Sequence, residues 1–95
     1  MIDKIITHVC DWYGLETASV LSRRVYPFSE ARACIVCLVV VFDVPRGRAE
    51  ASRRLNVSRG TVTNRYNSRV DELRMCPNSD FSKAFWTIYK ELNEN

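Results

Sequence analysis

The sequence predicts one small all-α domain, a bundle of about five to six helices. Apolar residues recur at intervals of about three and four positions in most of the chain, which is the period of a helix that buries one face. Three glycines and three prolines in 95 residues are too few for a β-sandwich or a disordered chain. A chain of this length supports one modest core and leaves no room for a separate catalytic domain.

The N-terminal third predicts two helices followed by a basic loop. We expect the first helix over Ile2–Tyr13, with Gly14 ending it because glycine adopts the left-handed conformation of a helix end. A short second helix is expected over residues 16–21. Arg23 and Arg24 then begin a loop, and adjacent arginines in a loop are either solvated or placed against a phosphate or a minor groove.

A nearly uninterrupted apolar segment predicts the central helix of the bundle. It should run over residues 30–42, capped by Ser29, and other helices must surround it because it is apolar on almost every side. The β-branched run 39–41 also suits a buried strand, but no second run of this kind is present to pair with it. Ten apolar residues are too few to span a bilayer, so no membrane partner is expected. Pro45 and Gly47 mark the turn that follows.

Residues 50–73 predict a helix, a tight turn and a longer second helix over about 59–73. Asn56 tolerates the left-handed conformation that ends a helix, and Ser58 is a strong N-cap because its hydroxyl accepts a free backbone N–H. On its buried side the second helix has an apolar residue at every third or fourth position, namely Val62, Tyr66, Val70 and Leu73. This pattern is typical of a helix-turn-helix and also occurs in plain helical bundles.

A last helix is expected over residues 81–92, with Ser79 or Asp80 as its cap. Its aromatic residues must pack either on the bundle or on a second subunit. The sequence therefore leaves open a homodimer, or a protein partner bound through this C-terminal helix.

Side chains at the start of the second motif helix favour DNA binding. Arg59, Thr63 and Asn64 are expected to point outward, and these residue types contact guanine, thymine and adenine in a major groove. Residues 46–74 include eight arginines, no lysine and three acids, so the segment carries +5 while the rest of the chain carries −2. Arginine suits bidentate contacts with phosphate, whereas lysine and glutamate would serve equally well on a merely solvated face.

We therefore predict two roles for side chains at a DNA interface. Base reading is assigned to Arg59, Thr63 and Asn64. The positioning of the protein on phosphates is assigned to Arg23, Arg24, Arg46, Arg48 and Arg65.

The four cysteines predict free thiols instead of disulfides. No secretory signal is expected at the N-terminus, which predicts a cytoplasmic protein whose thiols stay reduced. Cys34 and Cys37 form a C-x-x-C inside the apolar segment, where no glycine or proline turn brings both thiolates to a metal, so we predict small buried residues. A zinc site that adds Cys10 or His8 is the alternative. With one histidine and no plausible triad, an enzyme is the poorest hypothesis, and neither a metal nor a cofactor is expected.

The order and spacing of several short segments resemble the C-terminal DNA-binding domain of the bacterial replication initiator DnaA, a member of the Trp-repressor-like helix-turn-helix group. The resemblance covers nearly the whole chain. The similar segments are 2–21 with its Trp12-Tyr13-Gly14 ending, 21–24, 30–42, Val44-Pro45, Gly60-Thr61-Val62, 68–73 and 78–92. A second resemblance, limited to residues 58–73, is to the promoter-reading helix of sigma factors and to LuxR-type regulators.

The first resemblance implies a set of DNA contacts. In that family a basic loop enters a minor groove, which implies this role for Arg23 and Arg24. It also implies that Pro45 and Arg46 lie near a phosphate. The resemblance further implies that four residues at the start of the second motif helix lie near the bases or adjacent phosphates, namely Ser58, Arg59, Gly60 and Thr61.

The chain also departs from that family in two places. The family's Asp-His pair ahead of Ser/Thr-Thr-Val is absent, and Ser58 and Arg59 stand there instead. The basic loop is also diluted by the uncharged residues Val25-Tyr26-Pro27-Phe28. In addition, the nucleotide-binding motif G-x-x-x-x-G-K-[ST] is missing, so the chain alone is not an ATP-driven initiator.

The leading hypothesis is sequence-specific binding of double-stranded DNA by a single helix-turn-helix domain over residues 1–95. The resemblance places it in bacterial replication initiation or transcriptional regulation, in the cytoplasm on the nucleoid. The alternative is a helical protein-interaction module that kept the fold and lost the DNA.

Overall fold

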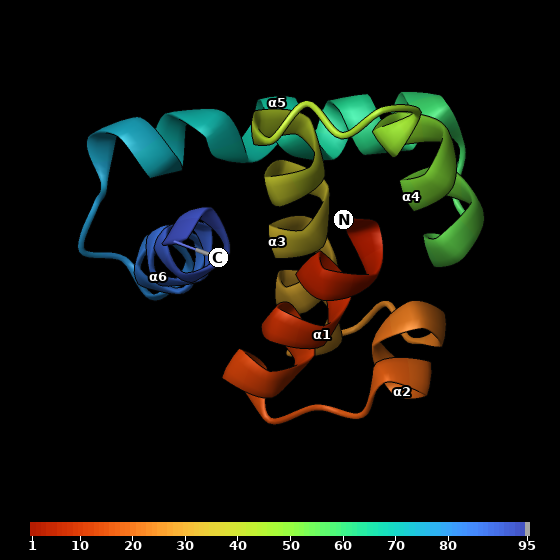
Figure 1. The fold of residues 1–95 in the computed structure, drawn as a ribbon, viewed down its shortest axis with the longest axis horizontal. Coiled ribbons are helices and arrows are strands. Elements are labelled where there is room, and N and C mark those ends of the chain that lie inside the picture. The colour runs from red at the N-terminus through yellow and green to blue at the C-terminus, as the bar shows by residue number, and fades with distance from the viewer. Residues whose placement is uncertain (95) are drawn as a thin grey trace.

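The computed structural model describes residues 1–94, which form six helices and no strand. The molecule measures 29 × 28 × 25 Å along its principal axes. The predicted all-α bundle is therefore confirmed. The helices are α1 (Ile2–Tyr13), α2 (Thr17–Ser22), α3 (Phe28–Val41), α4 (Gly47–Leu55), α5 (Arg59–Met75) and α6 (Asp80–Glu94), shown in Figure 1.

Helix α3 is the centre of the bundle, as its apolar sequence predicts. Nine successive residues, 31–39, are buried, and α3 contacts each of the other five helices. It begins at Phe28, and the prediction that Ser29 caps it is wrong. The chain turns before that position, because the Val25 carbonyl already accepts the Ser29 N–H at 3.0 Å and the Pro27 carbonyl accepts the Ala31 N–H at 3.3 Å.

The other helix ends follow the predicted signals closely. Gly14 has a φ of 65° and ends α1, and Asn56 has a φ of 55° and ends α4. The Ser58 hydroxyl accepts the Thr61 N–H at 3.1 Å and so caps α5. Ser79 caps the last helix in the same way, because its hydroxyl accepts the Ser82 N–H at 3.1 Å.

Helices α4 and α5 form the predicted helix-turn-helix, and the first of them begins at Gly47, earlier than expected. Figure 1 shows α5 along one side of the molecule, with α4 below its N-terminal end and α6 below its C-terminal end. Val62 and Leu73 are buried on its inner side, while Tyr66 and Val70 are half-buried. The N-terminal half of α5 is therefore held by α3 and α4 with its outer side free.

The aromatic C-terminal helix packs on its own bundle. Phe85 is buried, and the Tyr89 ring stacks on Phe42 at the end of α3 with a centroid distance of 4.9 Å. Trp86 donates its indole N–H to the Leu73 carbonyl at 3.3 Å. Of the two expected packing partners, the structure thus places this helix against the bundle. Within residues 1–94, each helix is too short or too polar to cross a membrane.

Candidate nucleic-acid interface

The outer side of α5 presents a strip of small, uncharged polar groups. Gly60, Asn64 and Asn67 are exposed, and their spacing places them opposite the buried Val62 and Leu73. We call Gly60, Asn64 and Asn67 the polar strip. Its amide groups have the donors and acceptors that base edges require.

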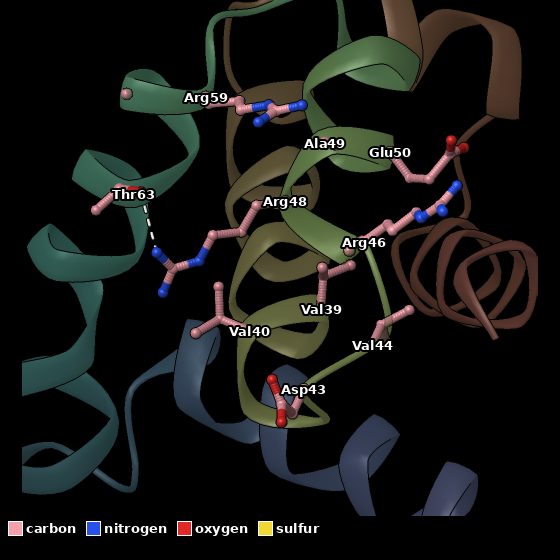
Figure 2. Close-up of a pocket in the computed structure, with 12 residues that line it drawn as sticks. Val39, Val40, Asp43, Val44, Arg46, Arg48, Ala49, Glu50, Arg59 and Thr63 are labelled. Atoms are coloured by element: carbon pink, nitrogen blue, oxygen red, sulfur yellow. Dashed lines mark hydrogen bonds between the residues drawn. The ribbon is translucent and has the colours of Figure 1, made fainter.

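A hollow of about 930 Å³ lies along one flank of this strip, between the end of α3 and the starts of α4 and α5. Its apolar wall is formed by Val39, Val40 and Val44. Three arginines line it from two helices and a turn, namely Arg46, Arg48 and Arg59, and the carboxylates of Asp43 and Glu50 line it as well. Figure 2 shows these side chains around the hollow.

The three arginines of this first group differ in how they are held. Arg48 donates from Nη1 to the Thr63 hydroxyl at 3.4 Å, so it orients this half-buried threonine (Figure 2). Arg46 has a φ of 56° at the start of α4 and is exposed, as is Pro45 before it. Within residues 1–94, the guanidinium groups of Arg46 and Arg59 have no hydrogen-bond or ion-pair partner.

The opposite flank of the polar strip carries a second arginine group, Arg24 and Arg65. Arg24 donates from Nη2 to the Asn56 carbonyl at 2.8 Å, which ties the basic loop to the α4–α5 turn. Arg65 is half-buried, and its guanidinium has no hydrogen-bond partner in the described part of the chain. Burial lowers the pKa of Arg65, and the nearby charge of Arg24 lowers it further. The group is therefore a concentration of positive charge that no carboxylate offsets.

Arg23 stands apart from this second group. Its guanidinium lies over the Phe28 ring, 5.4 Å from the centroid, and the residue is exposed. The structure thus separates the two adjacent loop arginines, because Arg24 is bonded to the turn and Arg23 is held only by the ring.

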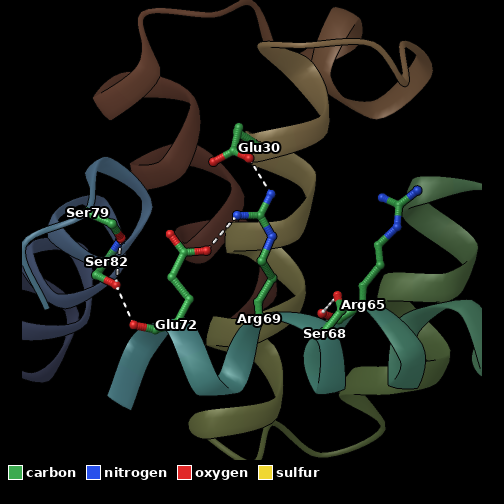
Figure 3. A network of polar contacts seen from close by, with 7 residues as sticks. All are labelled: Glu30, Arg65, Ser68, Arg69, Glu72, Ser79 and Ser82. Atoms are coloured by element: carbon green, nitrogen blue, oxygen red, sulfur yellow. Dashed lines mark hydrogen bonds and ion pairs between the residues drawn. The ribbon is translucent and has the colours of Figure 1, made fainter. Parts of the chain in front are cut away.

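Other arginines of the basic segment serve the fold. Arg69 on α5 pairs with Glu30 on α3 and with Glu72, as Figure 3 shows. Its guanidinium also lies 4.5 Å from the centroid of the Phe81 ring on α6. In the same view Arg65 is directed away from these two carboxylates.

Two further arginines on α4 are also paired. Arg53 pairs with Glu50, and Arg54 pairs with Asp3 of α1 at 2.8 Å. The charge of +5 in residues 46–74 is therefore only partly available to a ligand.

The hydroxyl groups expected near DNA are engaged at the helix cap. The Ser58 and Thr61 hydroxyls lie 2.9 Å apart and hydrogen-bond to one another, and Thr61 is half-buried. These two side chains therefore stabilise the start of α5. Gly60 lies between them and has no side chain, so the backbone of the first turn is uncovered at this position. A Cβ added there would meet only the Ser58 hydroxyl, at 3.8 Å.

Arg32 is a residue that no sequence pattern singled out, and it is 0 % exposed in the middle of the central helix. Burial lowers its pKa to about 10, with smaller contributions from the charges of Arg65 and Arg24. The side chain therefore stays protonated at neutral pH. The available signal was a single charged residue in an otherwise apolar segment, since such residues are rarely buried without partners.

Three of the four thiols are buried. Cys10, Cys34 and Cys37 lie in the core and Cys76 is exposed, and all four are free. Burial raises the pKa of Cys37 to about 12. His8 is half-buried, with Nδ1 at 2.8 Å from the Lys4 carbonyl of its own helix. Among residues 1–94 there is no cluster of three or more histidine, cysteine or acidic side chains that would hold a metal ion.

Comparison with known proteins gives no relative: no protein-family model, no curated protein and no solved structure matches this chain.

Proposed function

We propose that this chain binds double-stranded DNA in a sequence-dependent manner, with α5 as the reading helix. One observation carries the proposal: the polar strip of α5 lies between two arginine groups, in which Arg46, Arg59 and Arg65 have no ion-pair partner within residues 1–94. A major groove about 12 Å wide admits an α-helix, and phosphates line both of its edges. The two arginine groups suit those two rows of phosphates, while the strip between them suits the bases.

Within this proposal, the surroundings of each side chain suggest whether it contacts a base or a phosphate. Arg59 and Asn64 are exposed near the start of α5, where recognition helices usually contact base edges. Arg48, Arg46, Arg24 and Arg65 are assigned to phosphates. Thr63 is held by Arg48, which leaves its methyl group as the part available to a thymine.

The DnaA-like resemblance extends the proposal to replication initiation or transcriptional regulation on the bacterial nucleoid. The order of the elements supports it: a basic loop comes before a buried central helix, and a helix-turn-helix and a closing helix come after it. On this relationship, Arg23 and Arg24 would lie toward a minor groove and Pro45 toward a phosphate.

The test is binding to random-sequence duplex DNA across a salt series, measured by fluorescence anisotropy. The four arginines assigned to phosphates predict a log–log slope of about −3.6, at about −0.9 per neutralised phosphate. The double variant Arg48→Gln, Arg65→Gln should reduce the slope by about two phosphates, close to 1.8. The control Arg74→Gln, at the far end of α5, should leave the slope nearly unchanged.

Selection of sites from a random library then tests sequence dependence. An enriched sequence that binds more tightly than random duplex supports the reading role of α5. Absence of binding at low salt contradicts the whole proposal.

A second candidate is a helical protein-interaction module. It is favoured by exposed apolar side chains on the last two helices, among them Met75 at 78 % at the end of α5 and Trp86 at 43 % on α6. A dimer in analytical ultracentrifugation that Trp86→Ser disrupts, together with no salt-dependent DNA binding, would support this function.

A further inference from the structure

The C-terminal ends of two helices are joined by one buried arginine. Arg32 on α3 donates from Nη1 to the Val20 carbonyl at 3.0 Å and to the Leu21 carbonyl at 2.9 Å, both near the end of α2. Its Nη2 donates to the Leu55 carbonyl at 2.5 Å, at the end of α4. The ends of α2 and α4 are thus both fixed to the central helix through one guanidinium.

This arrangement suits the two terminal nitrogens of a guanidinium, while the buried Nε of Arg32 has no hydrogen-bond partner within residues 1–94. The last carbonyls of a helix lack partners within it and carry partial negative charge, so they stabilise a buried cation. Within residues 1–94, Arg32 has carbonyl acceptors and no carboxylate partner. A planar guanidinium donates to these acceptors from two separate nitrogens, whereas the compact ammonium of lysine donates from one nitrogen only. Without the arginine, buried carbonyls lose their donor.

The end of α4 in turn determines where α5 begins. Only residues 56–58 separate Leu55 from Arg59, the first residue of α5. Asn56 is held in the left-handed conformation, and its carbonyl accepts from Arg24. The turn therefore has little freedom once the Leu55 carbonyl is fixed.

We propose that Arg32 is a positioning residue for the DNA interface, because it fixes the end of α4 and thereby the placement of Arg59 and the polar strip. The inference rests on the proposed DNA-binding function. Arg32 does not touch DNA, since it is completely buried. It acts through the turn between the two motif helices.

The test compares Arg32→Met and Arg32→Lys with a core variant at another place, Ile88→Val. Ile88 is buried on α6, which contacts α5 but not α4, so this control perturbs the core away from the end of α4. The measured quantity is the ratio of the dissociation constants for random duplex and for a selected site. Arg32→Met should reduce this ratio about tenfold, the equivalent of about one base contact. Arg32→Lys should reduce it less, and Ile88→Val should preserve it.

Amide hydrogen exchange gives a second readout that needs no DNA. The Asn56 N–H donates to the Arg53 carbonyl at 3.3 Å, and the Val57 N–H donates to the Ser52 carbonyl at 3.0 Å. In both Arg32 variants these two amides should exchange at least about tenfold faster relative to amides of α6, because local opening of the turn becomes easier. In Ile88→Val the relative rates should stay as in the wild-type protein.

The possible results distinguish a failure of the positioning role of Arg32 from a failure of the proposed DNA-binding function. If the wild-type protein reads DNA and folded Arg32 variants keep both the ratio and the turn protection, the positioning role is overturned. If Arg32→Met does not fold, the lysine variant decides by the same two measurements. If the wild-type protein does not bind DNA, the proposed function fails, and the role of Arg32 in DNA reading fails with it.

Discussion

The individual arginines of this protein differ in the groups that balance their positive charge. Arg32 is surrounded by carbonyls and Arg69 by two carboxylates, so both charges are used within the fold. Arg59 is exposed and unpaired in the described chain, so its donors remain free for a ligand. Residue type alone therefore does not show which arginines are free for a ligand; the partners of each side chain show it.

The clearest prediction at this scale compares Arg59 with Arg48. Arg59→Ala should weaken binding to a selected site by about 1–3 kcal/mol and relax the sequence preference, because a base contact is lost. Arg48→Ala should weaken binding to all duplexes alike, because phosphates carry no sequence information. The measurement is the dissociation constant of each variant on selected and random duplexes. Equal losses on both duplexes for Arg59→Ala would contradict its assigned role.

Among the elements, α5 depends on its first turn for a defined start. Ser58→Ala removes the hydroxyl that accepts the Thr61 N–H and should lower the free energy of unfolding by about 1 kcal/mol, as expected for an N-cap. Ser68→Ala is the matched control, because the Ser68 hydroxyl only donates to the Arg65 carbonyl of its own helix. Urea unfolding checks both variants, and equal losses would contradict the cap.

The glycines in the first turns of the two motif helices should respond to alanine in opposite ways. A Cβ at Gly47 would lie 2.6 Å from Val39 Cγ1 and 3.0 Å from Val44 Cβ, so Gly47→Ala should destabilise by about 1–3 kcal/mol through overpacking. Gly60→Ala meets only the Ser58 hydroxyl and should stabilise by about 0.5–1 kcal/mol, because glycine weakens a helix. Both changes are measured by urea unfolding. A Gly47→Ala protein as stable as the wild type would show that α4 is free to move away from α3.

Two helix ends that depend on hydrogen bonds between residues close in sequence were predicted correctly. Gly14 and Ser58 act on backbone groups within a few positions, and both helix ends lie where the sequence places them. Ser29 does not cap α3 because the turn into the helix starts before it: the carbonyl of Val25 already accepts the Ser29 N–H. The outward placement of Asn64 was predictable because helical periodicity alone determines it.

Pairings between distant segments were not predictable from a pattern. Arg32 meets Leu55 across 23 positions, and Arg54 meets Asp3 across 51. Only the packed fold decides which arginine of a basic segment finds an internal partner. Sequence composition therefore predicted a basic interface but overstated the charge that it offers.

For the molecule as a whole, α3 organises the core and contacts both helices of the helix-turn-helix. Its buried segment carries Cys34 and Cys37 on the same helix as Arg32, so the thiols lie in the interior on which the motif packs. Thiol labelling therefore reports on the intact bundle. A thiol reacts as the thiolate, and burial raises the pKa of both cysteines.

We expect one thiol of the folded protein to react quickly with a disulfide reagent at neutral pH and three to react only through unfolding. Cys76 is the exposed thiol, and Cys76→Ser should remove the fast phase without changing the slow one. Because the buried thiols become accessible when the bundle opens, their labelling rate should rise with urea together with the unfolding rate. All four should react at once in the unfolded protein. Fast labelling of Cys34 or Cys37 in the native state would instead mean that α3 is accessible without unfolding, and would reopen the C-x-x-C as a metal site.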